Sequence, residues 1–329
     1  MRILLVNPRG FCAGVEMAIE SVERALELCG TPLYVYHEIV HNKHVVESLR
    51  STGVVFVDEL ERVPAGSYLL YSAHGVSPQI REVARRRKLR TIDATCPLVT
   101  KVHREAIRYA RNGYTIVLIG HANHDETVGT MGEAPEHTYL IEDVEDVDRL
   151  EVPDPDRLVY LTQTTLSIDD AARIIERLKQ RFPSIIGPPS EDICFATQNR
   201  QTAVKEWLHE ADIVLVVGSR NSSNSNRLAE IAREVGKPAH LIDSADDMDL
   251  AWFSGDATVL LTAGASAPES AVVACVDRLV EQFGATVEQR SLLEEKARFA
   301  LPAELLQLAA ASTRGTPVTA VESSGSSMS

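Results

Sequence analysis

The sequence lacks several features that would place it in a common functional class. No apolar run approaches the roughly 20 residues that a membrane helix needs, so we expect a soluble protein with no membrane association. Its 33 basic residues are outnumbered by 47 acidic ones, and the resulting net charge of −14 argues against nucleic acid as a partner. Neither a Walker A motif nor a Gly-x-Gly-x-x-Gly motif is present, so no standard nucleotide-binding loop is predicted.

Cysteines are few and odd in number. Five cysteines in 329 residues, without a signal peptide, do not predict a disulfide framework, so we expect a cytoplasmic protein with reduced thiols. Cys29 and Cys275 lie on the apolar stripes of predicted helices and are interpreted as small buried hydrophobic residues. The other three, Cys12, Cys96 and Cys194, occupy a different kind of position.

A threefold internal repeat organises most of the chain. Each copy is predicted to begin at a strand-to-helix corner that carries a cysteine: Cys12, Cys96 and Cys194. A helix, an apolar strand and a polar loop follow at nearly constant spacing, and the loops carry His41, His124 and Ser222. A second polar loop follows a later strand in each copy. This regularity indicates three related units.

Strands that alternate with helices predict parallel sheets joined by right-handed crossovers. We therefore predict an α/β fold of three pseudo-threefold-related units with mostly parallel sheets, covering residues 1–95, 96–193 and 194–285. Residues 286–329 are predicted to form a C-terminal extension, with a disordered Ser-rich tail from Ala309. Because ligands bind beyond the carboxyl ends of parallel strands, three units around one axis would share a central cavity.

Three thiolates from separate corners can hold a metal centre but leave it one protein ligand short. A 4Fe-4S cluster held in this way has one iron open to substrate, as a catalytic zinc ion has one open position. Three unrelated structural cysteines remain the alternative interpretation.

The strand-end loops supply hydrogen-bond donors without fixed charge, which suits a phosphate group. The candidates are His41, His74, His124, Thr164 or Thr165, Ser222, Ser223, Asn224 and Ser266. The last loop is predicted to precede a helix that begins at Arg227. Glu126 is a candidate proton relay, with Asp125 as a competitor that is more typical of a turn. The remaining histidines considered are interpreted as structural or surface residues: His37, His44, His103 and His121.

In combination, these stretches resemble the 4-hydroxy-3-methylbut-2-enyl diphosphate reductases of the non-mevalonate isoprenoid pathway. The resemblance covers roughly residues 1–285 and is carried by NPRGFCAGV, SAHGVS, DATCPLVTKVH, TQTTLS, GSRNSSNSNRLAE and TAGASAP. It implies three α/β domains around one 4Fe-4S cluster with an open iron, held by Cys12, Cys96 and Cys194. It also implies Glu126 as the proton-relay acid with Thr164 beside it, and a diphosphate pocket formed by His41, His74, His124, Ser222, Ser223, Asn224 and Ser266.

The reaction implied by the resemblance is the last step of that pathway. Two electrons and two protons convert 4-hydroxy-3-methylbut-2-enyl diphosphate to isopentenyl and dimethylallyl diphosphate by reductive dehydroxylation. The implied partner is an electron donor such as ferredoxin or flavodoxin with its NADPH-dependent reductase. The residues alone leave two other hypotheses open: a three-cysteine zinc hydrolase of a phosphorylated small molecule, with Glu126 as general base, and an iron–sulfur sensor or electron carrier.

Overall fold

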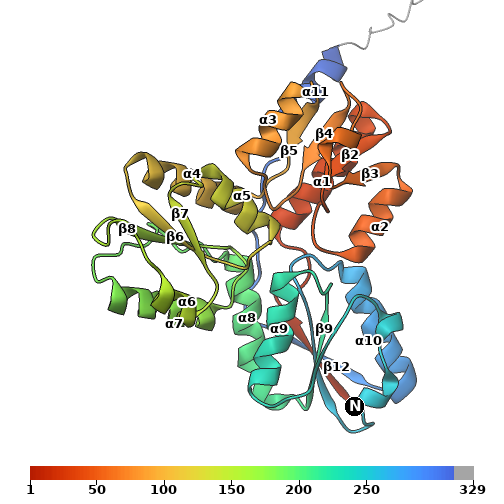
Figure 1. Ribbon diagram of the computed structural model, residues 1–329. Coiled ribbons are helices and arrows are strands. Elements are labelled where there is room, and N and C mark those ends of the chain that lie inside the picture. Colours follow the sequence, from red (N-terminus) through yellow and green to blue (C-terminus); the bar gives the residue numbers. More distant parts are fainter. Residues whose placement is uncertain (315–329) are drawn as a thin grey trace, which may run out of the picture.

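The computed structural model describes residues 1–314. Three parallel β-sheets with their helices form three lobes that meet at the centre of the molecule (Figure 1). This arrangement confirms the predicted α/β class with three parallel sheets. No helix in the described part of the chain is both long and apolar enough to cross a membrane.

The first unit contains a four-stranded sheet in the order β3-β2-β4-β5. Its strands are β2 (Leu33–Tyr36), β3 (Val54–Val57), β4 (Tyr68–Tyr71) and β5 (Arg90–Asp93). Its helical elements are α1 (Ala13–Cys29), α2 (Lys43–Ser51), the 3-10 turn η1 (Leu60–Arg62) and α3 (Pro78–Arg86). The stripe Val15, Ala18 and Val22 of α1 packs in one core with Leu33 and Val35 of β2, as the helical spacing predicts.

The second unit contains a three-stranded sheet in the order β7-β6-β8. Its strands are β6 (Thr115–Ile119), β7 (Thr138–Ile141) and β8 (Leu158–Thr162). Its helices are α4 (Pro97–Arg111), α5 (Asp125–Glu133), α6 (Val144–Arg149) and α7 (Ile168–Arg181). Val102 and Ala106 of α4 share a buried core with Ile116 and Leu118 of β6, which fixes α4 on this sheet.

The third unit contains a five-stranded sheet in the order β10-β9-β11-β1-β12. Its strands are β1 (Arg2–Asn7), β9 (Ile213–Val217), β10 (Ala239–Ile242), β11 (Thr258–Ala263) and β12 (Thr286–Ser291). Its helical elements are α8 (Phe195–Trp207), η2 (Leu208–Glu210), α9 (Ser223–Glu234), η3 (Ala245–Asp247), η4 (Leu250–Trp252) and α10 (Glu269–Phe283).

The placement of β1 corrects the predicted first unit. The sequence assigned this strand to residues 1–95, but it lies between β11 and β12 in the third sheet. Ile3, Leu4 and Val6 are completely buried. A continuous apolar strand of this kind is stable in the interior of a parallel sheet, where burying each such side chain contributes about 1.5–3 kcal/mol. The other predicted unit boundaries stay predictions.

Each of the three cysteines lies where the chain passes from one unit to the next. Cys12 joins β1 of the third sheet to α1 of the first unit, and Cys96 joins β5 of the first sheet to α4 of the second. Cys194 leads into α8 but follows no strand, since the pairing described before it is an isolated bridge between Val159 and Ile186. The predicted strand-to-helix corner is therefore wrong for Cys194. Prolines follow Ile186, and proline cannot donate to a strand ladder.

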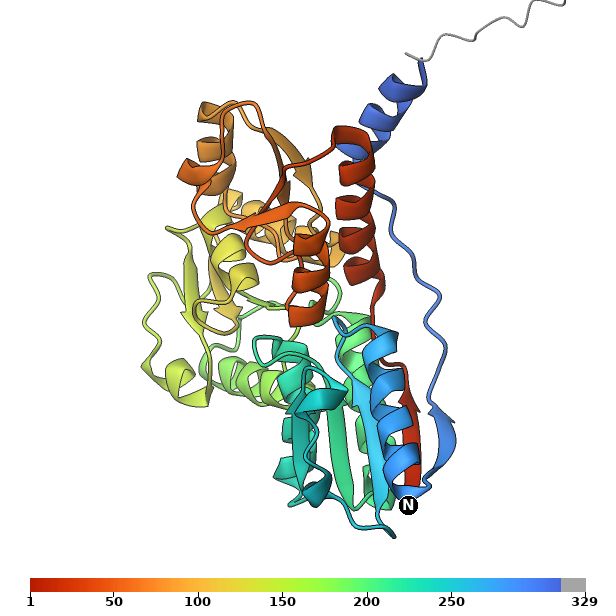
Figure 2. The ribbon, with the colours of Figure 1, turned by 90° about the vertical axis from the view of Figure 1, so that its right-hand side faces the viewer.

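The C-terminal part of the described chain ties the third unit to the first. Strand β12 belongs to the third sheet, and residues 292–302 run from it as an extended segment to α11 (Ala303–Arg314) (Figure 2). Leu305 of α11 is 1% exposed and packs in the core that contains α1. The predicted disorder is wrong for residues 309–314, which are helical. The rest of the Ser-rich tail lies outside the described residues.

Candidate active site

The three cysteines lie at the N-termini of three helices, and these N-termini meet at one cavity. Cys12, Cys96 and Cys194 are the N-cap residues of α1, α4 and α8. All three are free thiols, and they line a single cavity of about 100 Å³. The threefold convergence predicted from the repeat is therefore present in the structure.

Burial dominates the chemistry of these thiols. It raises the pKa of Cys96 to about 12 and that of Cys194 to about 11, and the neighbouring sulfur of Cys12 adds to both shifts. A helix N-terminus favours the thiolate, but here this effect is smaller than the cost of desolvating the charge. Thiols in such a site ionise when a cationic metal centre replaces their protons.

Gly14 leaves space between two of the sulfur atoms. A Cβ atom at this position would lie 2.6 Å from Sγ of Cys96 and 4.0 Å from Sγ of Cys12. Real side chains do not approach a sulfur atom as closely as 2.6 Å, so only glycine fits in this turn of α1. The absence of a side chain at Gly14 therefore allows the Cys96 side chain to lie against the first turn of α1, close to Cys12.

Three histidines form one edge of the cavity. The rings of His41 and His74 are stacked with centroids 3.9 Å apart, and the ring of His124 meets His41 edge-on at 5.3 Å. Burial, followed by the neighbouring imidazoles, lowers the pKa of His74 well below its usual value and that of His124 to about 4. His74 and His124 are therefore neutral at pH 7 and can donate without carrying charge.

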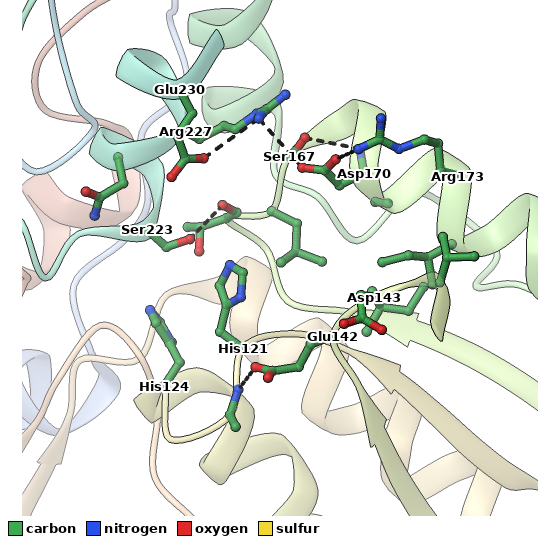
Figure 3. A pocket seen from close by; sticks show the side chains of 18 of the residues that line it. His121, His124, Glu142, Asp143, Ser167, Asp170, Arg173, Ser223, Arg227 and Glu230 are labelled. Atoms are coloured by element: carbon green, nitrogen blue, oxygen red, sulfur yellow. Dashed lines mark hydrogen bonds and ion pairs between the residues drawn. The ribbon is translucent and has the colours of Figure 1, made fainter. Parts of the chain in front are cut away.

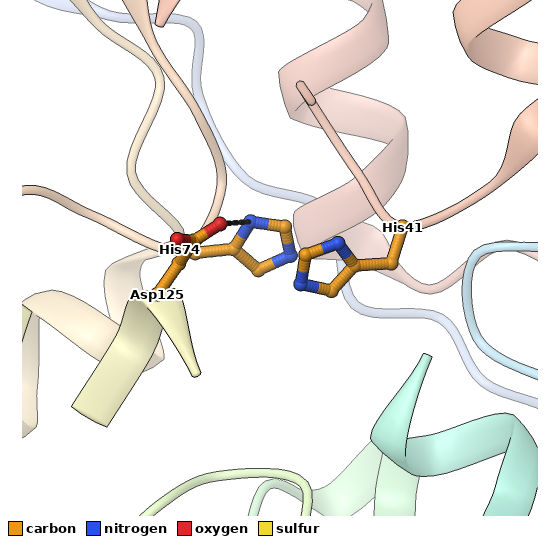
Figure 4. Close-up of side chains that lie close together, drawn as sticks. All are labelled: His41, His74 and Asp125. Carbon is orange, nitrogen blue, oxygen red and sulfur yellow. Dashed lines mark ion pairs between the residues drawn. The ribbon is translucent and has the colours of Figure 1, made fainter. Parts of the chain in front are cut away.

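Asp125 contacts one of these histidines, His74, and also the neighbouring His37. Its carboxylate lies 2.8 Å from Nδ1 of His37. It also lies 3.9 Å from Nδ1 of His74 (Figure 4). The hydrogen bond to Asp125 raises the pKa of His37. Sequence reasoning considered Asp125 only as a turn residue or as a competitor of Glu126. It missed this contact because His37 and His74 lie in loops of the first unit, after β2 and β4, whereas Asp125 belongs to the second.

Glu126 is a buried acid at the start of α5. Its Oε1 accepts a hydrogen bond of 2.6 Å from the backbone N–H of Thr164, and its Oε2 accepts one of 3.0 Å from the Thr164 hydroxyl. Burial raises the pKa of Glu126 to about 7, because the two hydrogen bonds from Thr164 only partly offset the loss of water. The carboxyl group can thus hold or release a proton near neutral pH.

The N-terminus of α9 forms the opposite edge. Ser222 is its N-cap, and Ser223 and Asn224 lie in its first turn, so the helix begins before the predicted Arg227. The side-chain oxygen of Asn224 accepts from the backbone N–H of Ala265 at 2.8 Å, and its buried side-chain amide nitrogen has no partner among residues 1–314. The hydroxyl of Ser266 donates to the backbone carbonyl of His41 at 2.9 Å. This edge presents helix N–H groups and an unpaired amide donor, which suit an anion.

Comparison with known proteins assigns this chain to a family. A family model described as LytB protein matches residues 3–280. The chain belongs to the LytB family. It is 58% identical over 310 residues to the 4-hydroxy-3-methylbut-2-enyl diphosphate reductase of Rhodopirellula baltica, spanning 94% of this chain and 97% of that protein. It is 56% identical over 305 residues to the protein of the same name from Mycolicibacterium paratuberculosis, spanning 92% of each.

Solved structures support the same assignment. The E-1-hydroxy-2-methyl-but-2-enyl-4-diphosphate reductase of Plasmodium falciparum superimposes with a TM-score of 0.92 and 43% sequence identity, over 95% of this chain and 99% of that one. A second reductase, described as the terminal enzyme of the non-mevalonate pathway, gives a TM-score of 0.61 and 29% identity over 85% of this chain and all of that one. The family resemblance predicted from the sequence is confirmed, and this LytB-family chain is an enzyme.

The cavity of this LytB-family enzyme brings together every predicted site residue. Its lining includes Cys12, His41, His74, Cys96, His124, Glu126, Thr164, Cys194, Ser222, Ser223, Asn224 and Ser266. Sequence reasoning missed its apolar wall, which includes Val40, Leu98, Val99, Phe195 and Phe299. Leu98, Val99 and Phe195 follow a cysteine closely and could have been inferred from the helix starts. Phe299 comes from the C-terminal segment and carries no sequence signal.

A larger groove of about 710 Å³ adjoins the cavity, between residues 121–124, the start of α6 and α7 of the second unit and α9 of the third (Figure 3). It shares His124, Thr165 and Ser223 with the cavity. In its wall, Arg227 of α9 pairs with Asp170 of α7 at 3.6 Å and with Glu230 at 3.7 Å. The pair with Asp170 joins α9 to the second unit beside the site, whereas the pair with Glu230 lies within α9.

One group of side chains in the described residues is compact enough for a single metal ion. The ligand atoms of His41, His74 and Asp125 lie within 4.8 Å of one another (Figure 4). The three cysteine sulfurs do not form such a group. Zinc holds thiolates at only about 2.3 Å, so the wider spacing of the sulfurs suits a multi-iron centre better than one zinc ion.

Proposed function

We propose that this chain catalyses the reductive dehydroxylation of 4-hydroxy-3-methylbut-2-enyl diphosphate. Two electrons and two protons remove the hydroxyl oxygen as water, and the products are isopentenyl diphosphate and dimethylallyl diphosphate. Support comes from the relatives that carry this enzyme name over nearly their whole length, and from a cavity that combines thiols, a titratable acid and anion-binding groups. The zinc hydrolase and electron-carrier hypotheses do not fit the family.

We propose that Cys12, Cys96 and Cys194 hold one 4Fe-4S cluster and leave one iron open to the substrate. The fit rests on three free thiols around one cavity, on their wide spacing and on the space that Gly14 leaves beside two of them. When bound, the cluster supplies single electrons and a Lewis acid for the departing oxygen. Because the three cysteines and Glu126 line the same cavity, a cluster held by these cysteines would lie near the Glu126 carboxyl group.

The diphosphate binds between the histidine edge and the N-terminus of α9. His41, His74 and His124 donate from one side, while Ser222, Ser223, Asn224 and Ser266 lie on the other. A neutral site avoids the cost of burying cations before the ligand arrives. Once the anion is bound, its charge favours protonation of the imidazoles, which then strengthens binding.

Glu126 holds the proton that leaves with the oxygen, and Thr164 keeps its carboxyl group in place. Both carboxyl oxygens accept hydrogen bonds from Thr164, so the side chain has one defined orientation in the cavity. A group with a pKa of about 7 is protonated in a useful fraction of molecules at neutral pH and can be reprotonated after each turnover. This carboxyl group, buried in the same cavity as the three cysteines, is the observation that carries the proposal.

The test is an electron paramagnetic resonance spectrum of the anaerobically reconstituted and reduced protein, recorded with and without the allylic diphosphate. We expect a 4Fe-4S signal that changes when the substrate binds. A protein that binds no cluster, or a cluster signal that the substrate leaves unchanged, would contradict the proposal. Isopentenyl and dimethylallyl diphosphate should accumulate when a reduced dye supplies electrons.

The electron donor and the cellular location follow from the proposed reaction. The chemistry requires an external one-electron donor, and we propose ferredoxin or flavodoxin with its NADPH-dependent reductase. We also propose a cytoplasmic location, in which the cysteines stay reduced.

A further inference from the structure

Arg200 is a completely buried cation between two of the cysteine corners. It lies on α8, six positions after Cys194, and is 0% exposed. One guanidinium nitrogen donates to the backbone carbonyl of Ala196 at 2.8 Å, and another donates to the backbone carbonyl of Gly10 at 2.8 Å. Ala196 lies two residues after Cys194, and Gly10 lies two residues before Cys12. A single side chain therefore connects the backbones of both corners.

The charge of Arg200 is balanced from the C-terminal segment. Glu295 lies 3.1 Å from the guanidinium group, and the side chain of Asn199 donates to the same carboxylate at 2.9 Å. A buried guanidinium without a counter-ion is strongly unfavourable, so Arg200 depends on this glutamate. The segment of residues 292–302 that supplies Glu295 also contributes Phe299 to the cavity wall.

The Cys12 corner needs such support because its backbone is unusual. Gly10 has a φ of +67°, and a Cβ atom there would lie 3.3 Å from the carbonyl oxygen of Ala267. The N–H of Cys12 donates to the carbonyl of Ala265 at 3.1 Å, and the Arg200 contact fixes the peptide on the other side of Phe11. Together these two bonds hold the loop that presents the Cys12 sulfur.

We propose that Arg200 and Glu295 form a positioning pair that holds the Cys12 and Cys194 corners at the separation that the cluster requires. The C-terminal segment is then part of the cofactor site. The proposal rests on the proposed function, because a cluster must be present for its retention to be measured. Cys96 has no contact with Arg200 among the bonds described and serves as an internal reference.

The test compares two variants with a matched control. Glu295→Gln removes the counter-charge, and the double variant Arg200→Met with Glu295→Leu replaces the pair by apolar side chains. Glu288→Gln is the control, because Glu288 also pairs with an arginine, Arg2 at 2.9 Å, but lies at a partly exposed position in β12. Melting of the cluster-free proteins separates loss of fold from loss of positioning.

Three measurements test the proposal. Iron and sulfide per chain are determined after anaerobic reconstitution, and the loss of cluster absorbance is followed in air. We expect about tenfold faster cluster loss in both variants, the size of effect typical of groups that orient metal ligands, and no change in Glu288→Gln. In cluster-free protein, alkylation of Cys12 and Cys194 should accelerate relative to Cys96.

The double variant distinguishes positioning from simple charge balance. If it melts like the parent protein, keeps its iron and shows unchanged alkylation ratios, the pair only neutralises a buried charge and the proposal is wrong. If the parent protein itself binds no cluster, the proposed function fails, whereas the alkylation ratios still test the pair.

Discussion

Replacing Glu126 by glutamine removes the titratable proton of this side chain while keeping its size and shape. Glutamine has nearly the same size, and its carbonyl oxygen can still accept the 2.6 Å hydrogen bond from the Thr164 N–H, so the cavity should keep its geometry. The Thr164 hydroxyl can turn to accept from the new amide group. The variant therefore loses a titratable proton and little else.

The structure gives the expected size and pH dependence of the effect. A positioned acid contributes about 10²- to 10⁴-fold to a rate, and we expect kcat to fall by that factor in Glu126→Gln. Because burial raises the pKa of Glu126 to about 7, parent turnover should decline as the pH rises through that value. The residual turnover of the variant should lack this decline.

The free energy of unfolding should also decrease as the pH rises through this range. The folded pKa of Glu126 is raised from an unfolded value of about 4.3, so its stabilising contribution is complete below pH 4.3 and is lost as the pH rises through about 7. Relative to Glu126→Gln, the parent protein should lose on the order of 3 kcal/mol between pH 4 and pH 8.

The assay is anaerobic turnover with a reduced dye, combined with calorimetric titration of the substrate. Substrate affinity should change little, since the carboxylate oxygens are already occupied by Thr164. Turnover of the variant within about twofold of the parent would refute the relay. A loss of affinity as large as the loss of rate would instead make Glu126 a binding residue.

Three further outcomes follow from the site. Cys96→Ser should abolish stable cluster binding, measured as iron per chain, whereas Cys275→Ser, at a buried cysteine in the third unit's core, should keep it; equal iron contents would contradict the ligand assignment. Gly14→Ala should also lose iron, because its Cβ would lie 2.6 Å from Sγ of Cys96, although alanine is the better helix former. Full iron content in this variant would show that the backbone around Cys96 can shift to accommodate the methyl group. Substrate binding at pH 7 should take up protons, because His74 and His124 are neutral in the free protein and a bound anion raises their pKa. Calorimetry in two buffers with different ionisation enthalpies measures this uptake, and equal heats would mean that no proton is bound.

Local patterns in the sequence were sufficient to predict the class of fold and the polar residues that line the central cavity. Apolar runs such as Ile213–Val217 are long enough to predict buried parallel strands, and the helical stripe that begins at Val15 predicts α1. Polar residues at strand ends predict the loops of the site, since carboxyl ends of parallel strands face the same edge. For this reason the twelve candidate residues, predicted one by one, line one cavity.

Only the tertiary structure determined which strands pair with one another and which protonation states the buried side chains adopt. Nothing local to residues 2–7 shows that β1 pairs with β11 and β12, because strand pairing depends on contacts far along the chain. The pKa of Glu126 and the neutrality of His74 arise from burial, which a linear pattern does not measure. Sequence analysis did not single out Arg200, and its burial depends on Glu295, which lies 95 positions further along the chain. Sequence encodes periodicity and residue chemistry, whereas desolvation and long-range pairing exist only once the three units have packed.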